Sequence, residues 1–301
     1  MVEYFQPHIS EYAILSNTWG ANSDDITYKD MVDSANLKTK SGYRKIQFCC
    51  KQTILKGLRH FWIDTCCIDK SSSAELSEAI NSMYRWYSLA GVCFVYLSDV
   101  PEVQLRRSRW FTRGWTLQEL LAPSQVEFFT AEGFFLGTRH LLCSVISEVT
   151  EIPAGTLQTR GMYDEWTPSN WTVAERLSWT RGRQTKRGED SVYCLLGILE
   201  VRILPIYGEG RPHAFKRLLR EIYGPGNYHG GRFLSHIEFE SPPTEGKGTE
   251  ARHDYMWYCC YCMYGPWPRA SFACGDCGYG RCRSCPSMAV PRTGPDQSIE
   301  S

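Results

Sequence analysis

The chain has 301 residues, of which 43% are hydrophobic and 22% are charged. This balance excludes a disordered polyelectrolyte, and the length suffices for one large domain or two ordinary ones. Lys plus Arg and Asp plus Glu number 33 each, so no excess of positive charge points to nucleic acid or an anionic membrane.

The first 130 residues alternate short apolar runs with segments of helical periodicity. Strands are predicted at 12–16, 60–64, 92–97 and 126–129, and helices at 43–56, between Ser72 and Gly91, and at 115–121. Helix-length crossovers between consecutive strands predict a mostly parallel sheet flanked by helices, an α/β fold of the flavodoxin-like kind.

The second half carries helical signals and few strand signals. Thr172 and Glu175 have the spacing of a capping box, and apolar periodicity predicts helices at 190–199 and 212–223. We expect residues 146–232 to form an all-helical extension packed on the sheet domain. A polar stretch rich in Pro, Gly and Glu predicts a linker at 233–254.

The N-terminus lacks the basic and apolar segments of a secretory signal. The longest apolar stretch, around residues 90–97, is too short to span a bilayer. These features predict a cytoplasmic protein without a membrane partner.

Polar and aromatic residues gather where the predicted strands end and helices begin. In an open α/β sheet this edge forms the ligand site. The residues concerned are Ser16, Asn17, Trp19, Asp64, Arg113, Trp115 and Glu119.

Four stretches, YAILSNTWG, WIDTCCIDKSSSAELSEAINSMYRWY, SRWFTRGWTLQELLAP and AERLSWTRGRQTKRGEDSVYCLLGIL, closely resemble the fungal HET (heterokaryon incompatibility) domain family. The matches span about residues 12–222 in the family's order. The resemblance implies a HET domain at 8–145 that triggers cell death when incompatible fungal strains fuse, often as the effector end of a larger receptor. The family usually has His where this chain has Asn17.

The HET domain is in turn similar in outline to TIR domains, which share a parallel sheet and oligomerise to signal death; some hydrolyse NAD. Their catalytic glutamate lies in a Trp-Cys-x-x-Glu-Leu-like stretch, which Trp115-Thr-Leu-Gln-Glu119-Leu120 resembles. The likeness implies Glu119 as the catalytic carboxylate and NAD as the substrate. Fold alone does not establish this activity.

Cleavage of the nicotinamide–ribose bond builds positive charge on the ribose, which a carboxylate at Glu119 can stabilise. Arg113 suits a phosphate, and Trp19 or Trp115 suits stacking on a base. The alternative is that Glu119 pairs with Arg113 and only fixes the helix.

The other candidates also have structural alternatives. Asp64 fits a ribose or cation site, and Ser16 and Asn17 fit substrate contact, but all three also suit turn-forming hydrogen bonds. The vicinal pair Cys66–Cys67 is assigned to packing. The basic loop at 181–187 is assigned to solvent exposure, with phosphate or partner binding as its alternative.

Seven of the fourteen cysteines lie between residues 259 and 285. Three C-x-x-C pairs predict a structural zinc site, with ligands drawn from Cys259, Cys262, Cys274, Cys277, Cys282 and Cys285. The predicted zinc-binding tail is 255–290, and the alternative is a disordered cysteine-rich end.

Three functions therefore remain open. The chain is an NAD-hydrolysing effector, a non-catalytic signalling module that acts by self-association or through an incompatibility receptor protein, or a degenerate HET copy. Its predicted setting is fungal non-self recognition, an innate-immunity function.

Overall fold

The computed structural model describes residues 10–18, 24–33, 37–101, 103–158 and 168–223, together with the backbone of three short strands nearer the C-terminus. Those strands, β6 (His253–Trp257), β7 (Trp267–Pro268) and β8 (Ser287–Pro291), form an antiparallel sheet in the order β7-β6-β8. Trp19 and the six predicted zinc ligands lie outside the described residues.

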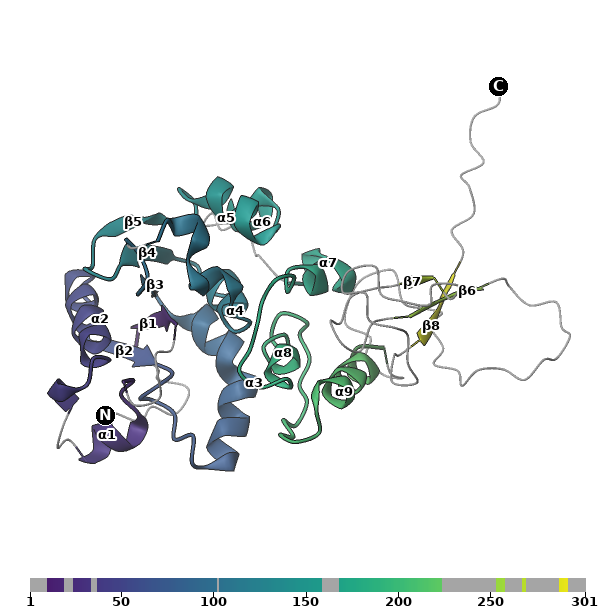
Figure 1. The fold of residues 1–301 in the computed structure, drawn as a ribbon, viewed down its shortest axis with the longest axis horizontal. Helices are drawn as coiled ribbons and strands as arrows, with labels where there is room; N and C mark the ends of the chain where they lie inside the picture. Colours follow the sequence, from purple (N-terminus) through teal and green to yellow (C-terminus); the bar gives the residue numbers. More distant parts are fainter. Residues whose placement is uncertain are drawn as a thin grey trace, which may run out of the picture.

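The main sheet has five strands in the order β2-β1-β3-β4-β5 (Figure 1). They are β1 (Tyr12–Asn17), β2 (His60–Ile63), β3 (Val92–Leu97), β4 (Val126–Thr130) and β5 (Phe135–Thr138). The first four strands run parallel, and β5 is antiparallel to β4. The predicted α/β fold with a mostly parallel sheet is thus confirmed. From β1 the chain passes to β2 on one side and then returns to β3 on the other, so the strand order reverses between β1 and β3.

Strand alternation divides the core into two layers. On β3, Phe94 packs in one cluster with Phe48 of helix α2 (Tyr43–Leu55). Its neighbour Val95 packs in the other cluster with helices α3 (Ser73–Leu89) and α4 (Thr116–Leu121). Successive side chains of a strand point to opposite faces, so one apolar strand supplies both cores. We call these layers the α2 face and the α3 face.

Helices of the second half share the core of the α3 face. They are α5 (Cys143–Thr150), α6 (Ala154–Gln158), α7 (Val173–Ser178), α8 (Asp190–Tyr193) and α9 (Arg211–Tyr223), and the short α1 (Tyr28–Asp33) lies earlier in the chain. Buried residues from α8 and α9 belong to the same apolar cluster as those of α3 and β3. At Gly197 a Cβ atom would lie 2.0 Å from Cβ of Tyr84 in α3, so the two segments touch backbone to side chain.

Two elements differ from prediction. The expected helix at 190–199 is α-helical only to Tyr193 and continues as turns, where Gly197 meets α3. Strand β5 was not predicted, because a four-residue edge strand has little apolar periodicity.

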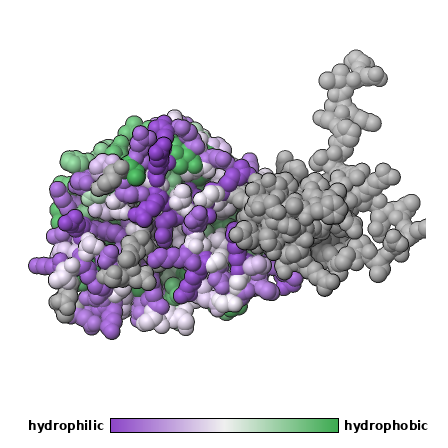
Figure 2. All heavy atoms as spheres, in the orientation of Figure 1, coloured by the Kyte–Doolittle hydropathy of each residue, from purple (hydrophilic) through white to green (hydrophobic). Residues whose placement is uncertain are grey.

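No helix in the described ranges is long and apolar enough to cross a membrane. Apolar side chains gather on the surface over β5 and α5, towards the top of the view in Figure 2. Phe134, Phe135 and Leu141 contribute to the exposed apolar surface of this part of the fold, with exposed fractions of 69%, 54% and 70%.

Candidate functional site

The centre of the site is a buried hydrogen-bonded chain at the carboxyl end of β1. Ser16 Oγ accepts a hydrogen bond from Trp110 Nε1 at 2.7 Å and donates one to Glu119 Oε2. Trp110 comes from a 3₁₀ helix (Arg109–Thr112), and Glu119 from the first turn of α4. Three distant segments therefore converge on one hydroxyl, which fixes the orientation of the Glu119 carboxyl group.

Burial sets the charge state of that carboxyl group. Glu119 is only 8% exposed, and loss of solvation raises its pKa from 4.5 to about 8. The negative charge of Asp64 adds to the increase, while Ser16, Arg113 and Arg183 oppose it. At neutral pH Glu119 is thus largely protonated but close to its titration point, which is typical of functional carboxyls.

Asp64 follows β2 directly, in the row of strand ends that includes Ser16. Its carboxylate forms an ion pair with Lys70 at 3.9 Å. Burial lowers the pKa of Lys70, and Asp64 and Asp25 counteract part of that effect. After burial, the charge of Asp64 is the next cause of the raised Glu119 pKa, so the two carboxyl groups interact electrostatically, and Ser16 bonds Glu119 directly.

Arg183 anchors the start of α4. Its Nη1 donates to Arg113 O and to Thr116 Oγ1, each at 2.9 Å, and the backbone of Arg113 forms a bridge with Gln184. The prediction of a solvent-exposed basic loop is therefore wrong for Arg183. Its fork fixes the turn before Glu119, and its charge also favours the ionised carboxylate.

Asn17 lies apart from this cluster. Its Oδ1 accepts a hydrogen bond from Lys45 Nζ of α2 at 2.9 Å, and Lys45 also bonds Thr18 O at 3.0 Å and Asp25 at 2.7 Å. Ser16 and Asn17 are consecutive strand residues that bond to opposite layers, so the sheet separates them. Within the described residues Asn17 Nδ2 has no hydrogen-bond partner.

Trp115 connects the site to the helical half. Its side chain lies close enough to Asp190 to favour the ionised carboxylate, which accepts a hydrogen bond from Tyr207 Oη at 2.8 Å. Burial raises the pKa of Asp190. Trp115 is partly buried against the α3-face core, so its ring orientation is set by packing as well as by Asp190.

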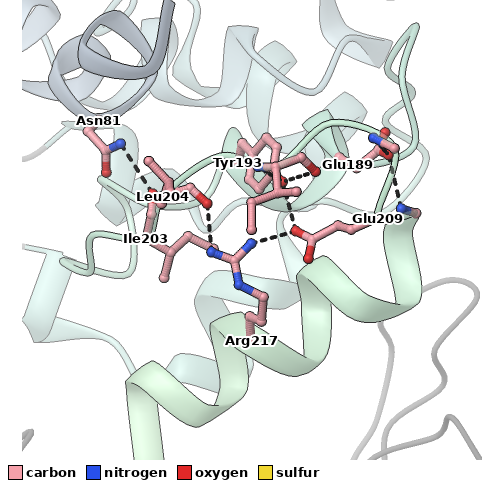
Figure 3. Close-up of polar contacts among 10 residues, drawn as sticks. Asn81, Glu189, Tyr193, Ile203, Leu204, Glu209 and Arg217 are labelled. Atoms are coloured by element: carbon pink, nitrogen blue, oxygen red, sulfur yellow. Dashed lines mark hydrogen bonds and ion pairs between the residues drawn. The ribbon is translucent and has the colours of Figure 1, made fainter. Parts of the chain in front are cut away.

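A second polar cluster holds the loop between α8 and α9 (Figure 3). Arg217 bonds Glu209 and Leu204 O, each at 2.6 Å, and Tyr193 Oη bonds Glu209 at 2.9 Å and Ile206 O at 3.0 Å. Every one of these bonds secures the same loop. The cluster is structural, and sequence patterns did not reveal it.

Metal and cofactor ligands gain no structural support. Among the described residues no three His, Cys, Asp or Glu side chains are arranged to hold a metal ion. The zinc site of the tail stays a prediction, because its six cysteines lie outside that part of the chain.

Sequence reasoning missed Trp110, Lys45 and Arg183 as site residues. Trp110 is fully buried and aromatic, so its composition signals only core packing, and its indole donor becomes meaningful once Ser16 is known to lie beside it. Lys45 and Arg183 are single cations in charged stretches. Only their carbonyl, amide and carboxylate partners distinguish them from solvent-exposed charges.

Comparison with known proteins identifies relatives by sequence. Residues 12–104 match the family described as "Heterokaryon incompatibility protein (HET)". Over 296 residues the chain is 39% identical to "Vegetative incompatibility protein HET-E-1" of Podospora anserina, an alignment that covers 91% of this chain and 21% of the relative. The chain thus spans about one fifth of that relative's length, and no solved structure matches it. These two matches support the assignment of the chain to the fungal heterokaryon incompatibility (HET) family.

Proposed function

We propose that this chain is an effector of fungal vegetative incompatibility and regulated cell death, and that it acts by hydrolysing NAD. Similarity to the HET family supports the biological role. The observation that carries the chemical role is the buried Glu119 carboxyl group, held by Ser16 beside Asp64 with a pKa raised to about 8. A TIR-like mode of action and a cytoplasmic location are parts of the same proposal.

The proposed reaction breaks the bond between nicotinamide and C1′ of the ribose. The bonding electron pair leaves with nicotinamide, positive charge develops on the ribose, and water adds to C1′. Ionised Glu119 stabilises that charge and takes the proton of the attacking water. In this proposal Asp64 binds ribose hydroxyls and Arg113 binds a phosphate.

The charge of the substrate favours this assignment. The nicotinamide ring of NAD is cationic, so its approach favours the ionised form of Glu119 and lowers the carboxyl pKa. The reaction requires ionised Glu119, so NAD binds productively only to protein in which this carboxyl group is already ionised. We therefore expect kcat/KM to increase with pH until the pH passes about 8, the pKa of the free carboxyl group.

The test is nicotinamide release from NAD by the purified full chain. Glu119→Gln keeps an acceptor for Ser16 but has no charge, and should reduce the rate about 100-fold or more. Glu148→Gln is the matched control, since Glu148 is 63% exposed in a surface pair with Arg106. Equal NAD cleavage by the Glu119 variant, or none by the unmodified chain, would contradict the enzymatic proposal.

A second candidate function is non-catalytic self-association. It is favoured by the exposed Phe134, Phe135 and Leu141 near β5, and by the small exposed fraction of Glu119. In that case Glu119 is a structural group, and cell killing survives Glu119→Gln. A Phe134→Ser and Phe135→Ser double variant should then lose both association and killing, whereas an enzyme that acts without this surface keeps its NAD cleavage.

A further inference from the structure

The turn after β2 carries two consecutive thiols, Cys66 and Cys67, whose chemistry the proposed reaction does not use. Their backbone N–H groups both donate to Ile63 O, at 3.2 and 2.9 Å. Their sulfur atoms also return to this residue: Cys67 Sγ accepts from Ile63 N at 3.4 Å, and Cys66 Sγ lies 3.9 Å from Ile63 O. The turn thus places both sulfurs against the backbone of one residue, Ile63.

We infer that Cys66 and Cys67 form a reversible oxidation site, in which a peroxide converts the two thiols to a vicinal disulfide. The inference rests on the turn geometry and does not depend on NAD hydrolysis. Its position two residues after Asp64 means that, if the proposed function holds, oxidation would alter the site.

The two thiols have different access and acidity. Cys66 is 3% exposed, whereas Cys67 is only partly buried. The neighbouring Cys67 sulfur and burial raise the pKa of Cys66, whereas the Cys66 thiol and the Ile63 N–H lower the pKa of Cys67. The nearby charge of Asp64 opposes ionisation of both thiols. Cys67 is therefore the thiol that reacts first, and Cys66 the one that resolves the product.

The reaction balances with hydrogen peroxide as the oxidant. The Cys67 thiolate attacks the O–O bond, forms an S–O bond and releases hydroxide, which takes up the thiol proton to become water. The Cys66 sulfur then attacks the Cys67 sulfur, and the hydroxyl group leaves with the Cys66 proton as a second water. Two thiols are oxidised to one disulfide, and one peroxide is reduced to two waters.

The product should be easily reduced. Consecutive Cα atoms are about 3.8 Å apart, whereas most disulfides join residues about 4.4–6.8 Å apart. The strained ring therefore favours return to the dithiol when a thiol reductant is supplied. A labile bond of this kind suits a regulatory modification better than a structural staple.

The chain contains its own matched control. Cys49 and Cys50 are also consecutive, but they lie within helix α2. Closing a disulfide there would disrupt the middle of a 13-residue helix, so this pair should remain reduced. Cys50 is exposed, which provides a test of whether accessibility alone decides reactivity.

The experiment treats the reduced full chain with a small molar excess of hydrogen peroxide, then alkylates it and digests it with trypsin. Residues 60–70 contain only Cys66 and Cys67, and residues 46–51 contain only Cys49 and Cys50. We expect peptide 60–70 to lose two hydrogens and take no alkyl group. Dithiothreitol treatment before alkylation should restore both thiols, so that each is then alkylated. The second peptide should show no internal disulfide.

Variants assign the order of attack. Cys67→Ser should slow oxidation of the remaining residue 66 thiol by about tenfold or more, because that thiol is buried and holds its proton. Cys66→Ser should leave Cys67 reactive but trapped as sulfenic acid, detectable with dimedone. Peptide analysis of the unmodified chain shows whether the Cys66–Cys67 disulfide forms, even if a variant does not fold. Full alkylation of peptide 60–70 after peroxide, or a crosslink from Cys67 to Cys49, would overturn the inference.

Discussion

Two carboxyl groups with the same exposed fraction show how differently the sheet edge and the helical half use burial. Glu119 and Glu189 are each 8% exposed. Burial raises the pKa of Glu119. Backbone N–H groups lower the pKa of Glu189, which accepts bonds from Gly208 at 2.9 Å and Gly210 at 3.0 Å. Desolvation and the charge of Asp64 outweigh the single Ser16 donor at Glu119, whereas backbone donors outweigh desolvation at Glu189.

The contrast links Glu189 to the stability of the fold and Glu119 to the proposed function. A carboxylate with backbone donors stabilises the loop that it holds. A carboxyl group with one hydroxyl donor and a neighbouring Asp is kept close to its titration point at a cost to the fold. Strain of this kind is expected where chemistry takes place.

The largest effect should come from breaking the contact that joins the two regions. In Gly197→Ala the new methyl group would meet Tyr84 of α3 at 2.0 Å, so the free energy of unfolding should fall by about 3 kcal/mol. Gly155→Ala in α6 is the control, because its Cβ meets nothing within 4 Å. Urea unfolding measures both. Equal stability of the two variants would contradict the close packing of the two regions.

Glu119 should make stability dependent on pH. Its folded pKa is raised from 4.5 to about 8, so its stabilising contribution is complete below about pH 4.5 and is lost as pH rises through about 8. Glu119→Gln should therefore gain about 2.5 kcal/mol relative to the unmodified chain between pH 5 and pH 7. Urea unfolding at both pH values tests this. An unchanged difference between the two proteins would show that Glu119 is not held protonated.

Glu189 should show the opposite sign. Its folded pKa is lowered, so its contribution is present above its ordinary pKa of 4.5 and is lost as pH falls through the folded value. Glu189→Gln should cost about 1–2 kcal/mol at pH 7, and the cost should shrink in acid. Thermal unfolding across acidic and neutral pH is the measurement. A cost that grows in acid would refute the assignment.

The smallest effects concern helix caps. Thr172 and Glu175 form a complete capping box at α7, whereas Glu75 of α3 bonds Asp69 N at 2.8 Å and leaves Ser72 to cap alone. Thr172→Ala should cost about 1 kcal/mol, and Ser72→Ala about half of that. Urea unfolding of both variants ranks them. The reverse order would mean that the two-sided box adds nothing.

Sequence patterns were sufficient for elements with strong local signals. The four parallel strands, α2 and α9 lie close to their predicted ranges, because apolar periodicity and glycine stops are local properties. The helix predicted at 190–199 was too long, because the tertiary contact at Gly197 is invisible in a local pattern. Strand β5 was missed because it is a four-residue edge strand with too few apolar residues to give a periodic signal.

The site was predictable only in part. The rule that polar residues gather at strand ends identified Ser16, Asp64 and Glu119. It could not show that Ser16 and Asn17 bond to opposite layers of the sheet, or that Trp110 donates to Ser16 across 94 positions of sequence. Hydrogen bonds between distant segments depend on the packed fold. No spacing in the sequence encodes them.

The most direct test of the contrast is a carbon-13 NMR titration of side-chain carboxyl groups in the folded protein, with Glu119→Gln and Glu189→Gln used to assign the two signals. We expect Glu119 to titrate at about pH 8 and Glu189 below 4.5. A Glu119 signal that titrates at or below 4.5 would show an ordinary ionised carboxylate, and the proposed active centre would lose its physical basis.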